Sequence, residues 1–190
     1  MKLWCATTNL GKLREFRLAG VDVQALPTVS EIPPSPESGV TFEENATEKA
    51  VYYSRFADGI LFADDSGLEV DALKGEPGVC SARFAGGHAT DVENNRLLLD
   101  RLALSTNRRG RFVCVIALAE NHRRVQTFRG EVEGEILHQP RGVNGFGYDP
   151  LFFYPPLGLT LAEVAPEEKF AISHRGKALR AMLRWLSAQK

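Results

Sequence analysis

The sequence predicts an α/β fold in which helices flank a mixed β-sheet, and three observations support this class. Short apolar segments alternate along the chain with segments of helical periodicity. Two capping boxes mark the starts of helices, and two alternating runs on either side of Asn121-His122 indicate a β-hairpin, which adds antiparallel strands. A chain of 190 residues is long enough to bury a core and is predicted to form one domain, residues 1–190.

The first elements are predicted from short stretches of alternating or helical pattern. Residues 3–6 are a predicted strand, residues 11–18 a helix, and residues 21–26, in which apolar and polar side chains alternate, a second strand. Residues 27–39 include the proline-rich stretch 33–36, so they are predicted to form a loop.

Two helices begin at capping boxes, in which a threonine precedes a glutamate by three residues. The first box, Thr41 with Glu44, opens a helix whose apolar side chains share one face: Phe42, Ala46, Ala50 and Tyr53. The second box, Thr90 with Glu93, opens another helix. Between the two helices, the apolar run at residues 60–62 predicts a short buried strand.

The second half of the chain completes the α/β pattern. Residues 111–120 and 124–133 are the predicted strands of the hairpin. From His174 onward the chain predicts a C-terminal helix with an apolar stripe: Leu179, Met182, Leu183 and Leu186.

The composition excludes several classes of partner. Lysine and arginine number 23 against 24 aspartates and glutamates, so the net charge of −1 indicates no basic surface for a nucleic acid, while one local basic site would suffice for a nucleotide. No apolar run has the length of a membrane span or of a signal peptide. Cys5, Cys80 and Cys114 are odd in number and widely separated, so we expect buried, reduced thiols and a cytoplasmic location.

Asp64 and Asp65 are the most informative residues for chemistry. They follow the apolar run 60–62, and Ser66 and Gly67 come directly after them. A buried unpaired carboxylate is costly, whereas Mg²⁺ prefers oxygen ligands and often binds through one or two carboxylates together with substrate phosphates. A strand that runs into a solvated Asp-Ser-Gly turn is the alternative, since these are ordinary turn residues. The pair alone does not decide between a turn and a metal site.

A second chemical signal lies between the first predicted strand and the first predicted helix. It combines hydroxyls, an amide, a glycine and a lysine: Thr7, Thr8, Asn9, Leu10, Gly11 and Lys12. At a helix N-terminus, free N–H groups and the helix dipole favour an anion such as phosphate. The loop is not a Walker A loop, which would need glycine at Ala6 and serine or threonine at Leu13. Taken alone, it is more simply interpreted as a polar helix cap.

Two further loops have the composition of a ligand site. Residues 144–150 place glycines beside aromatic side chains, so a backbone can approach a planar ligand while a ring stacks on it. A glycine-rich turn with core aromatics is the alternative. Near the C-terminus, Lys169 and Ser173 precede the last helix, and Ser173 is its predicted N-cap. His174 and Arg175 would then lie in the first helical turn, where an anion or a base carbonyl would compensate their charge.

Six blocks of the sequence resemble the signature blocks of the inosine triphosphate pyrophosphatase family, the non-canonical purine (dITP/XTP) pyrophosphatases. The blocks are residues 7–12, 41–46, 63–68, 78–83, 146–150 and 172–176. Each is weak alone, but six in family order over essentially the whole chain are specific. The resemblance implies a long, curved mixed sheet with flanking helices, two lobes around a central active-site cleft, and a homodimer.

The resemblance also implies a reaction. Mg²⁺ and water would convert ITP, dITP or XTP to the monophosphate and pyrophosphate, which removes deaminated purines from the nucleotide pool. By position, Asp65 matches the general base and a metal ligand, with Asp64 as its partner in the metal sphere. Lys12 and the loop from Thr7 to Gly11 would hold phosphate oxygens, and Lys49 matches another lysine that faces the phosphates.

The purine base would be framed by the third loop and read by donors near the C-terminus. The framing residues, one of whose aromatic rings would stack on the base, are Phe146, Gly147, Tyr148 and Asp149. Lys169, His174 and Arg175 would donate to the 6-keto oxygen, where adenine carries an amino donor instead. Ser66 matches a substrate contact. The residue that rejects the 2-amino group of guanine is not identified by the sequence.

One departure from the family pattern affects the second metal ligand. Relatives carry consecutive acids before the Thr-Phe helix start, whereas this chain has only Glu37. Glu37 is therefore the candidate, with Glu44 as the fallback and a solvated acid as the alternative for both. Two other functions fit the same loops: a pyrophosphatase for modified pyrimidine triphosphates, and a nucleotide-binding module without turnover. The adjacent Asp pair argues against the module, because simple binding needs fewer carboxylates.

Overall fold

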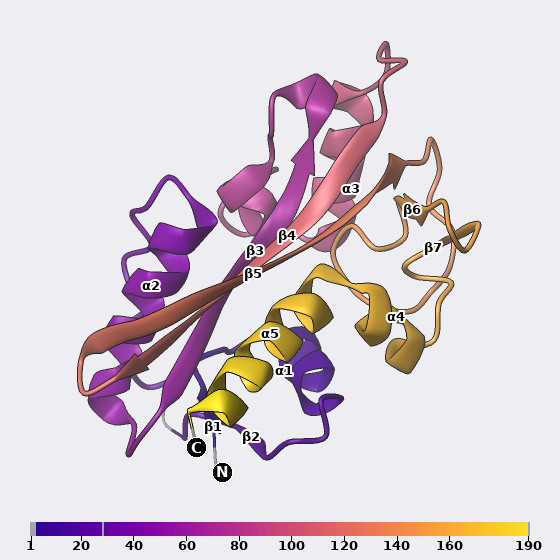
Figure 1. Cartoon of the computed structure of the whole chain (residues 1–190). Helices are drawn as coiled ribbons and strands as arrows, with labels where there is room; N and C mark the ends of the chain where they lie inside the picture. Colours follow the sequence, from indigo (N-terminus) through magenta and orange to yellow (C-terminus); the bar gives the residue numbers. More distant parts are fainter. Residues whose placement is uncertain (1–2, 28, 190) are drawn as a thin grey trace. The chain divides into compact units, whose positions relative to one another are not determined.

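The computed structural model describes residues 3–27 and 29–189, so Thr28 of the predicted loop lies outside the described part. Within these residues the strands are β1 (Leu3–Cys5), β2 (Val23–Ala25), β3 (Leu61–Val70), β4 (Arg109–Glu120), β5 (Arg123–Ile136), β6 (Phe152–Tyr154) and β7 (Leu159–Thr160) (Figure 1). The α-helices are α1 (Leu10–Arg17), α2 (Phe42–Tyr53), α3 (Asp91–Arg101), α4 (Pro166–Ile172) and α5 (His174–Ala188). None of the described helices combines the length and apolarity that crossing a membrane requires.

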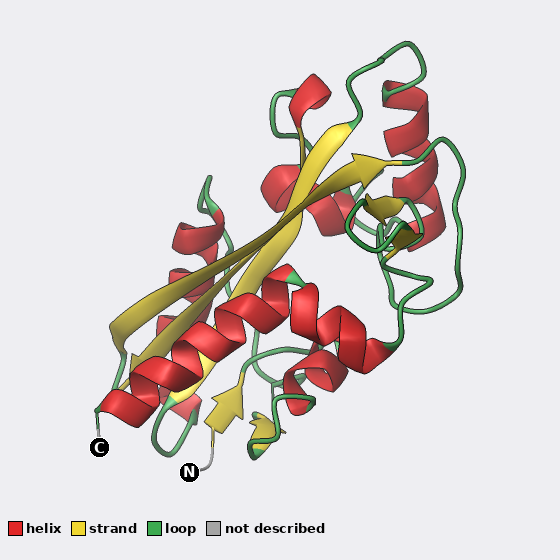
Figure 2. Ribbon diagram, turned by 45° about the vertical axis from the view of Figure 1, so that its right-hand side comes forward, coloured by secondary structure: helices red, strands yellow, loops and turns green. Residues whose placement is uncertain are grey.

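The described strands form one mixed sheet in the order β2-β1-β3-β4-β5-β6-β7. Figure 2 draws the strands in yellow and the helices in red. β1 is parallel to both β2 and β3, and Trp4 lies opposite Leu61 in the second pairing. β6 is antiparallel to β5 and to β7. The prediction of a mixed sheet with flanking helices is therefore confirmed.

Contacts divide the chain into two compact units, which we call unit 1 and unit 2. Unit 1 comprises Met1–Asp65, Cys114–Gly130 and His174–Lys190. Unit 2 comprises Ser66–Val113 and Glu131–Ser173. β3, β4 and β5 contribute residues to both units.

In unit 1, the capping box and the apolar helix faces that the sequence predicted are confirmed. Thr41 accepts a hydrogen bond from the Glu44 N–H, and the Glu44 carboxylate accepts one from the Thr41 N–H, which together form the capping box of α2. The predicted apolar face of this helix is buried: Phe42, Ala46, Ala50 and Tyr53. α5 packs against α1 and buries Leu179, Met182 and Leu186, while Leu183 is half-buried.

In unit 2, α3 begins at the second predicted capping box, Thr90 with Glu93. The apolar core of this unit gathers side chains from β3, α3, β4, β5 and the segment around β6: Leu68, Val70, Leu98, Leu102, Phe112, Val132, Ile136, Tyr148, Leu151, Phe152 and Leu161. Ser81 fixes one edge of the core, because its hydroxyl accepts from the Leu68 N–H and donates to the Gly78 carbonyl. Gly67 is required beside it, since a Cβ there would lie 2.3 Å from the Ser81 Oγ.

The predicted hairpin is confirmed, and its turn has the conformation that the strands require. Asn121 and His122 have φ angles of 49° and 65°, the left-handed values of a tight hairpin turn. β4 and β5 extend beyond the predicted ranges, to Arg109–Glu120 and Arg123–Ile136.

The main correction to the predicted elements concerns β3. The sequence predicted a short strand at residues 60–62 that ends before the aspartates, but β3 continues through Asp64 and Asp65 to Val70. The strand can continue because each carboxylate is buried with a cationic partner and does not need solvent.

Two smaller predictions are also corrected. Lys169 was expected in a loop but lies in α4, which Pro166 opens at a position where proline suits a helix start. All three cysteines are free, and Cys5 and Cys114 are buried as expected. Cys80 is exposed, because it lies on the solvent side of the short 3-10 segment Gly78–Arg83.

Candidate active site

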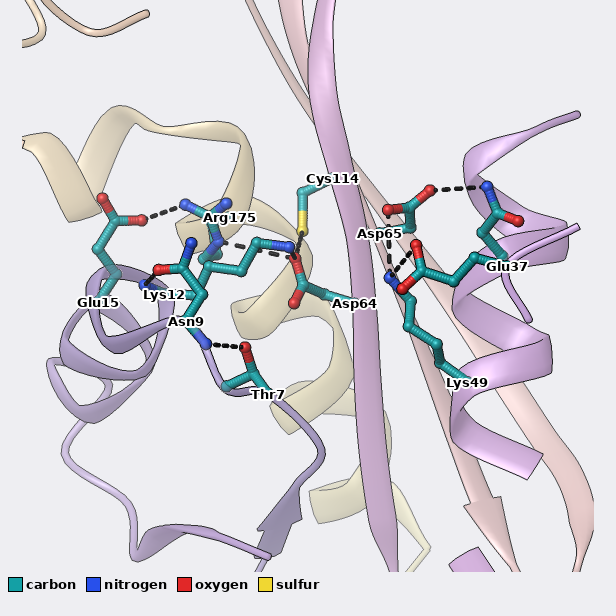
Figure 3. Close-up of polar contacts among 11 residues, drawn as sticks. Thr7, Asn9, Lys12, Glu15, Glu37, Lys49, Asp64, Asp65, Cys114 and Arg175 are labelled. Carbon is teal, nitrogen blue, oxygen red and sulfur yellow. Dashed lines mark hydrogen bonds and ion pairs between the residues drawn. The ribbon is translucent and has the colours of Figure 1, made fainter. Parts of the chain in front are cut away.

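The two adjacent aspartates of β3 face different surroundings, all of them in unit 1. Because successive side chains of a strand point to opposite faces, Asp64 and Asp65 diverge (Figure 3). The Asp64 carboxylate lies 2.9 Å from Lys12 Nζ and 3.9 Å from Arg175 Nε. The Asp65 carboxylate accepts from Lys49 Nζ and from Asn45 Nδ2, each at 3.2 Å. The pair therefore supplies two separate charged clusters.

The two clusters differ in electrostatics. Burial alone would raise the pKa of Asp64, but Lys12 and Arg175 outweigh it and lower that pKa to about 2. Burial raises the pKa of Asp65 above its ordinary value, against the opposing effect of Lys49 and Lys12. Asp64 is thus a fixed anion, whereas Asp65 is the stronger proton acceptor of the two, as a general base requires.

The loop before α1 is a capped helix start with a lysine directed to Asp64. Thr7 Oγ1 accepts from the Asn9 N–H at 3.2 Å, and Asn9 Oδ1 accepts from the Lys12 N–H at 3.0 Å. Asn9 is the N-cap, so the interpretation as a polar cap is correct. The first N–H groups of any helix have no partner within the helix, so the start of α1 offers donors beyond the one that the Asn9 side chain uses. Thr8 and Leu10 are exposed beside them.

Arg175 is buried in unit 1, in the first turn of α5. It forms an ion pair with Glu15 of α1, and its guanidinium lies 5.9 Å from the centroid of the Phe16 ring. Burial alone would lower the pKa of Arg175, but Glu15 and Asp64 raise it above its ordinary value. Cys114 Sγ lies 4.0 Å from Asp64 Oδ2 in the same cluster. Arg175 therefore links the start of α5 to α1 and β3, with His174 buried next to it.

The geometry distinguishes the two candidates for a second metal ligand. Both carboxylates make contacts, but of different kinds. The Glu44 carboxylate accepts from the Val40 and Thr41 N–H groups at 2.9 and 3.0 Å and so serves the N-terminus of α2. The Glu37 carboxylate lies 3.6 Å from Lys49 Nζ, on the same ammonium that contacts Asp65. Its backbone is left-handed, with a φ of 48°, a strain typical of functional sites.

These side chains fit Mg²⁺ as a partial site that substrate phosphates would complete. Among the described residues, no three His, Cys, Asp or Glu side chains are grouped as a metal site. Asp65 and Glu37 nevertheless converge on one cation, the Lys49 ammonium. One or two carboxylates are the usual protein share of a Mg²⁺ site in which phosphates and water complete the shell.

Unit 2 holds a second, buried charged cluster around the third predicted loop. Lys169 Nζ lies 2.5 Å from Asp149 Oδ2, and both residues are 3% exposed. The same oxygen accepts from the Phe146 N–H at 2.8 Å. The Phe146 ring centroid lies 5.1 Å from Lys169 Nζ, a cation–π distance. The Lys169 ammonium thus lies over the Phe146 ring while it pairs with Asp149.

Comparison with known proteins identifies the family. Residues 3–185 match the sequence profile of the Ham1 family. The chain belongs to this family. It is 49% identical over 186 residues to the dITP/XTP pyrophosphatase of Exiguobacterium sp. strain AT1b, an alignment that covers 96% of this chain and 95% of the relative. It is 50% identical over 188 residues to a dITP/XTP pyrophosphatase of Thermus thermophilus, covering 96% and 90% of the two chains.

Solved structures of Ham1 proteins share the fold. The Staphylococcus aureus Ham1 protein is 39% identical with a TM-score of 0.89, and the match covers 100% of both chains. The HAM1 protein of Coxiella burnetii is 41% identical with a TM-score of 0.88, covering 99% of both chains. The resemblance predicted from the six sequence blocks is confirmed.

In this Ham1-family chain, the predicted site residues fall into two groups. Unit 1 brings together the loop from Thr7 to Lys12, the Asp64 and Asp65 clusters, and Arg175. Unit 2 brings Phe146, Asp149 and Lys169 together. Tyr148 is buried in the core of unit 2, where its hydroxyl donates to the Ser81 carbonyl, and Ser66 is half-buried in β3. The predicted base donors are divided, because Lys169 belongs to unit 2 while His174 and Arg175 belong to unit 1.

Two residues of these clusters were missed from the sequence. Asn45 contacts Asp65, and its signal was available, since it lies one helical turn before Lys49 and thus on the same face of α2. Glu15, the ion-pair partner of Arg175, lies one turn after Lys12 on α1. Its partner is 160 residues away in sequence, so no local pattern indicates the pairing.

Proposed function

We propose that this Ham1-family protein hydrolyses dITP, XTP and ITP to the nucleoside monophosphate and pyrophosphate with Mg²⁺, and so removes deaminated purines from the nucleotide pool. The observation that carries the proposal is the Asp65 carboxylate, buried beside Lys49 and Asn45 with a raised pKa. The full-length relatives named dITP/XTP pyrophosphatase supply the reaction that such a base would serve.

In the proposed mechanism, water attacks the anhydride between the α- and β-phosphates and pyrophosphate leaves. Asp65 accepts the proton of the attacking water as general base. Lys49 and Lys12 bind phosphate oxygens, and the N–H groups at the start of α1 bind further oxygens. Asp65 and Glu37 would hold Mg²⁺, which would supply charge neutralisation for the phosphates.

That Asp64 is a metal ligand stays a prediction. The contacts of the Asp64 carboxylate support an additional role. Asp64 lies 2.9 Å from Lys12 Nζ and shares Arg175 with Glu15. A fixed anion there holds the Lys12 ammonium in place. We therefore propose that Asp64 acts mainly through Lys12.

In the proposal, the purine base is recognised by donors that come from both units. The Phe146 ring stacks on the purine, while Lys169 with His174 and Arg175 donates to the 6-keto oxygen. Adenine presents an amino donor at that position, which would face these donors instead of accepting from them and so disfavour ATP. The family resemblance further supports one domain over residues 1–190 with two lobes around a central cleft, a homodimer, and a cytoplasmic location.

A panel of nucleotides tests the proposed function. Pyrophosphate release with Mg²⁺ is expected to be strong from ITP, dITP and XTP and weak from GTP, ATP and dTTP. A preference for dTTP would indicate a pyrimidine pyrophosphatase. Uniformly low turnover by protein that still binds ITP would indicate a binding module.

The assignment of Glu37 predicts a change in the Mg²⁺ requirement. Glu37→Gln removes one ligand charge, so the Mg²⁺ concentration for half-maximal ITP hydrolysis is expected to rise about tenfold. Glu44→Gln is the matched control, because Glu44 serves the α2 N-terminus and its loss is expected to lower Tm rather than Mg²⁺ affinity. A titration in which Glu44→Gln raises the Mg²⁺ requirement and Glu37→Gln does not would reverse the assignment.

A further inference from the structure

Gly147 lies in the loop of residues 144–150 that is proposed to frame the purine, which we call the base loop. Both backbone polar groups of Gly147 form hydrogen bonds with side chains of the first two turns of α3. The Gly147 N–H donates to Asp91 Oδ2 at 2.7 Å. The Gly147 carbonyl accepts from Asn95 Nδ2 at 2.9 Å. Asp91 and Asn95 are one helical turn apart and therefore lie on the same face of α3. All of these residues belong to unit 2.

This clamp, formed by Asp91 and Asn95, acts next to the side chains that would recognise the base. Gly147 directly follows Phe146, whose N–H donates to the Asp149 carboxylate that pairs with Lys169. The residue after Gly147, Tyr148, is anchored through its hydroxyl to the Ser81 carbonyl. Within the described loop, Gly147 is thus the point at which α3 sets the path of the backbone between the Phe146 ring and the Asp149–Lys169 pair.

The backbone around Gly147 belongs to no helix or strand, so its conformation depends on hydrogen bonds from outside the loop. Gly145 and Gly147 have φ angles of 74° and 62°, and residues 143–151 form bends and turns rather than a helix or strand. Glycine-rich backbone of this kind has many accessible conformations when free. Two hydrogen bonds to a rigid helix restrict them, and they satisfy both polar groups of the Gly147 residue.

The capping of α3 does not explain the contacts of the two clamp residues. α3 is already capped by Thr90 and Glu93, so its N-terminus does not need the Asp91 carboxylate. The neighbouring Asn94 stabilises a different segment, since it accepts from the Ala85 N–H and donates to the Ala82 carbonyl. Asp91 and Asn95 therefore serve the base loop.

We infer that Asp91 and Asn95 are positioning residues for purine recognition. They hold Gly147, and through it Phe146, Asp149 and Lys169, in the arrangement that binds the base, without contact to the phosphates. This inference rests on the proposed function. When the loop has its binding conformation in only a fraction of the molecules, the apparent affinity for a ligand that needs this conformation is the intrinsic affinity multiplied by that fraction. Loss of the clamp must therefore weaken ligands that carry the base and spare those that carry only phosphate.

The test compares two products of the proposed reaction as inhibitors of ITP hydrolysis. IMP carries the base, and inorganic pyrophosphate carries only phosphates. For the double variant Asp91→Ala with Asn95→Ala, which removes the acceptor and the donor of the clamp, the KM for ITP and the inhibition constant of IMP are expected to rise about tenfold. kcat and the inhibition constant of pyrophosphate are expected to change less than about twofold, and the preference for ITP over ATP is expected to fall.

Matched variants separate positioning from general damage. Asp100→Asn removes an exposed acid from the same helix and is expected to behave as the wild type. Asp91→Asn keeps an acceptor oxygen of the same reach and is expected to recover much of the IMP affinity that Asp91→Ala loses. If the double variant does not fold, the single Asp91→Ala variant carries the comparison, because Asp91 is exposed and its loss leaves the core intact.

The outcomes distinguish this inference from the proposed function. Wild-type protein that does not hydrolyse ITP overturns the proposed function and, with it, the role assigned to the clamp. Wild-type turnover together with unchanged IMP inhibition in the variants overturns the clamp alone. An equal rise in the inhibition constants of IMP and pyrophosphate also overturns it, because a clamp on the base loop acts only on the base.

Discussion

Replacing Asp65 with asparagine is expected to reduce kcat for ITP by about 1,000-fold or more, because the proton acceptor and one charge at the metal site are lost together. Asparagine keeps the size of the side chain, so the inhibition constant of IMP is expected to stay within about threefold of the wild-type value. Steady-state kinetics of the purified variant with ITP, with IMP as competitor, measures both quantities.

The contacts of Asp65 also predict a modest loss of stability in this variant. Asn45 donates to Asp65 Oδ2 and cannot turn its amide freely, because its Oδ1 accepts from the Gly39 N–H at 2.8 Å. An asparagine at position 65 would therefore lose one of the two hydrogen bonds at this carboxylate, which costs roughly 1 kcal/mol. Asp58→Asn, an exposed acid of unit 1, is the control for kinetics and stability. A kcat for Asp65→Asn equal to that of the control would remove Asp65 from the mechanism.

Replacing Asp64 with asparagine is expected to lower the free energy of unfolding by about 3–5 kcal/mol, since it takes one counter-charge from the buried Arg175 and from the neighbouring Lys12 and leaves Glu15 to balance them. For a chain of this length, Tm is expected to fall by roughly 10 °C. Chemical denaturation and thermal melting of the variant beside Asp58→Asn measure the effect. Turnover is expected to fall as well, because Lys12 loses the anion that orients it.

The pH dependence of this loss follows from the lowered pKa of Asp64. A carboxyl whose folded pKa is about 2, against an ordinary value of 3.8, stabilises the fold above the ordinary value and loses this contribution as the pH falls through the folded value. The difference in unfolding free energy between wild type and Asp64→Asn is therefore expected to be constant near neutral pH and to shrink below about pH 4. A difference that grows toward acid pH would contradict the ion-pair account.

The elements that the sequence predicted well depend on local signals. The Thr41–Glu44 and Thr90–Glu93 boxes act between residues three apart, and the left-handed turn at Asn121-His122 is set by the two residues themselves. The length of β3 was not predictable in this way. Two adjacent aspartates indicate a turn unless buried cations neutralise them, and those cations come from α1, α2 and α5.

In the candidate site, too, local motifs were predictable from the sequence and distant contacts were not. The residue types of the phosphate loop, the Asp pair and the aromatic-glycine loop were visible as motifs, and the family followed from their order. The partner of each charged group was not visible. Lys169 pairs with Asp149 across 20 residues, and Arg175 pairs with Glu15 across 160. The role of Asp91 and Asn95 also required the structure, because a contact to the backbone of a glycine leaves no side-chain pattern.

The sequence by itself thus determined the α/β class, the helix starts, the hairpin and the set of residues that carry the chemistry. Only the tertiary structure decided that Asp64 and Asp65 belong to different clusters, with Lys12 and Arg175 on one face of β3 and Lys49 on the other. The physical reason is the alternation of side chains along a strand, which directs neighbours in the chain to opposite faces. Each carboxylate then acquires its pKa from helices that are distant in sequence and adjacent only after folding.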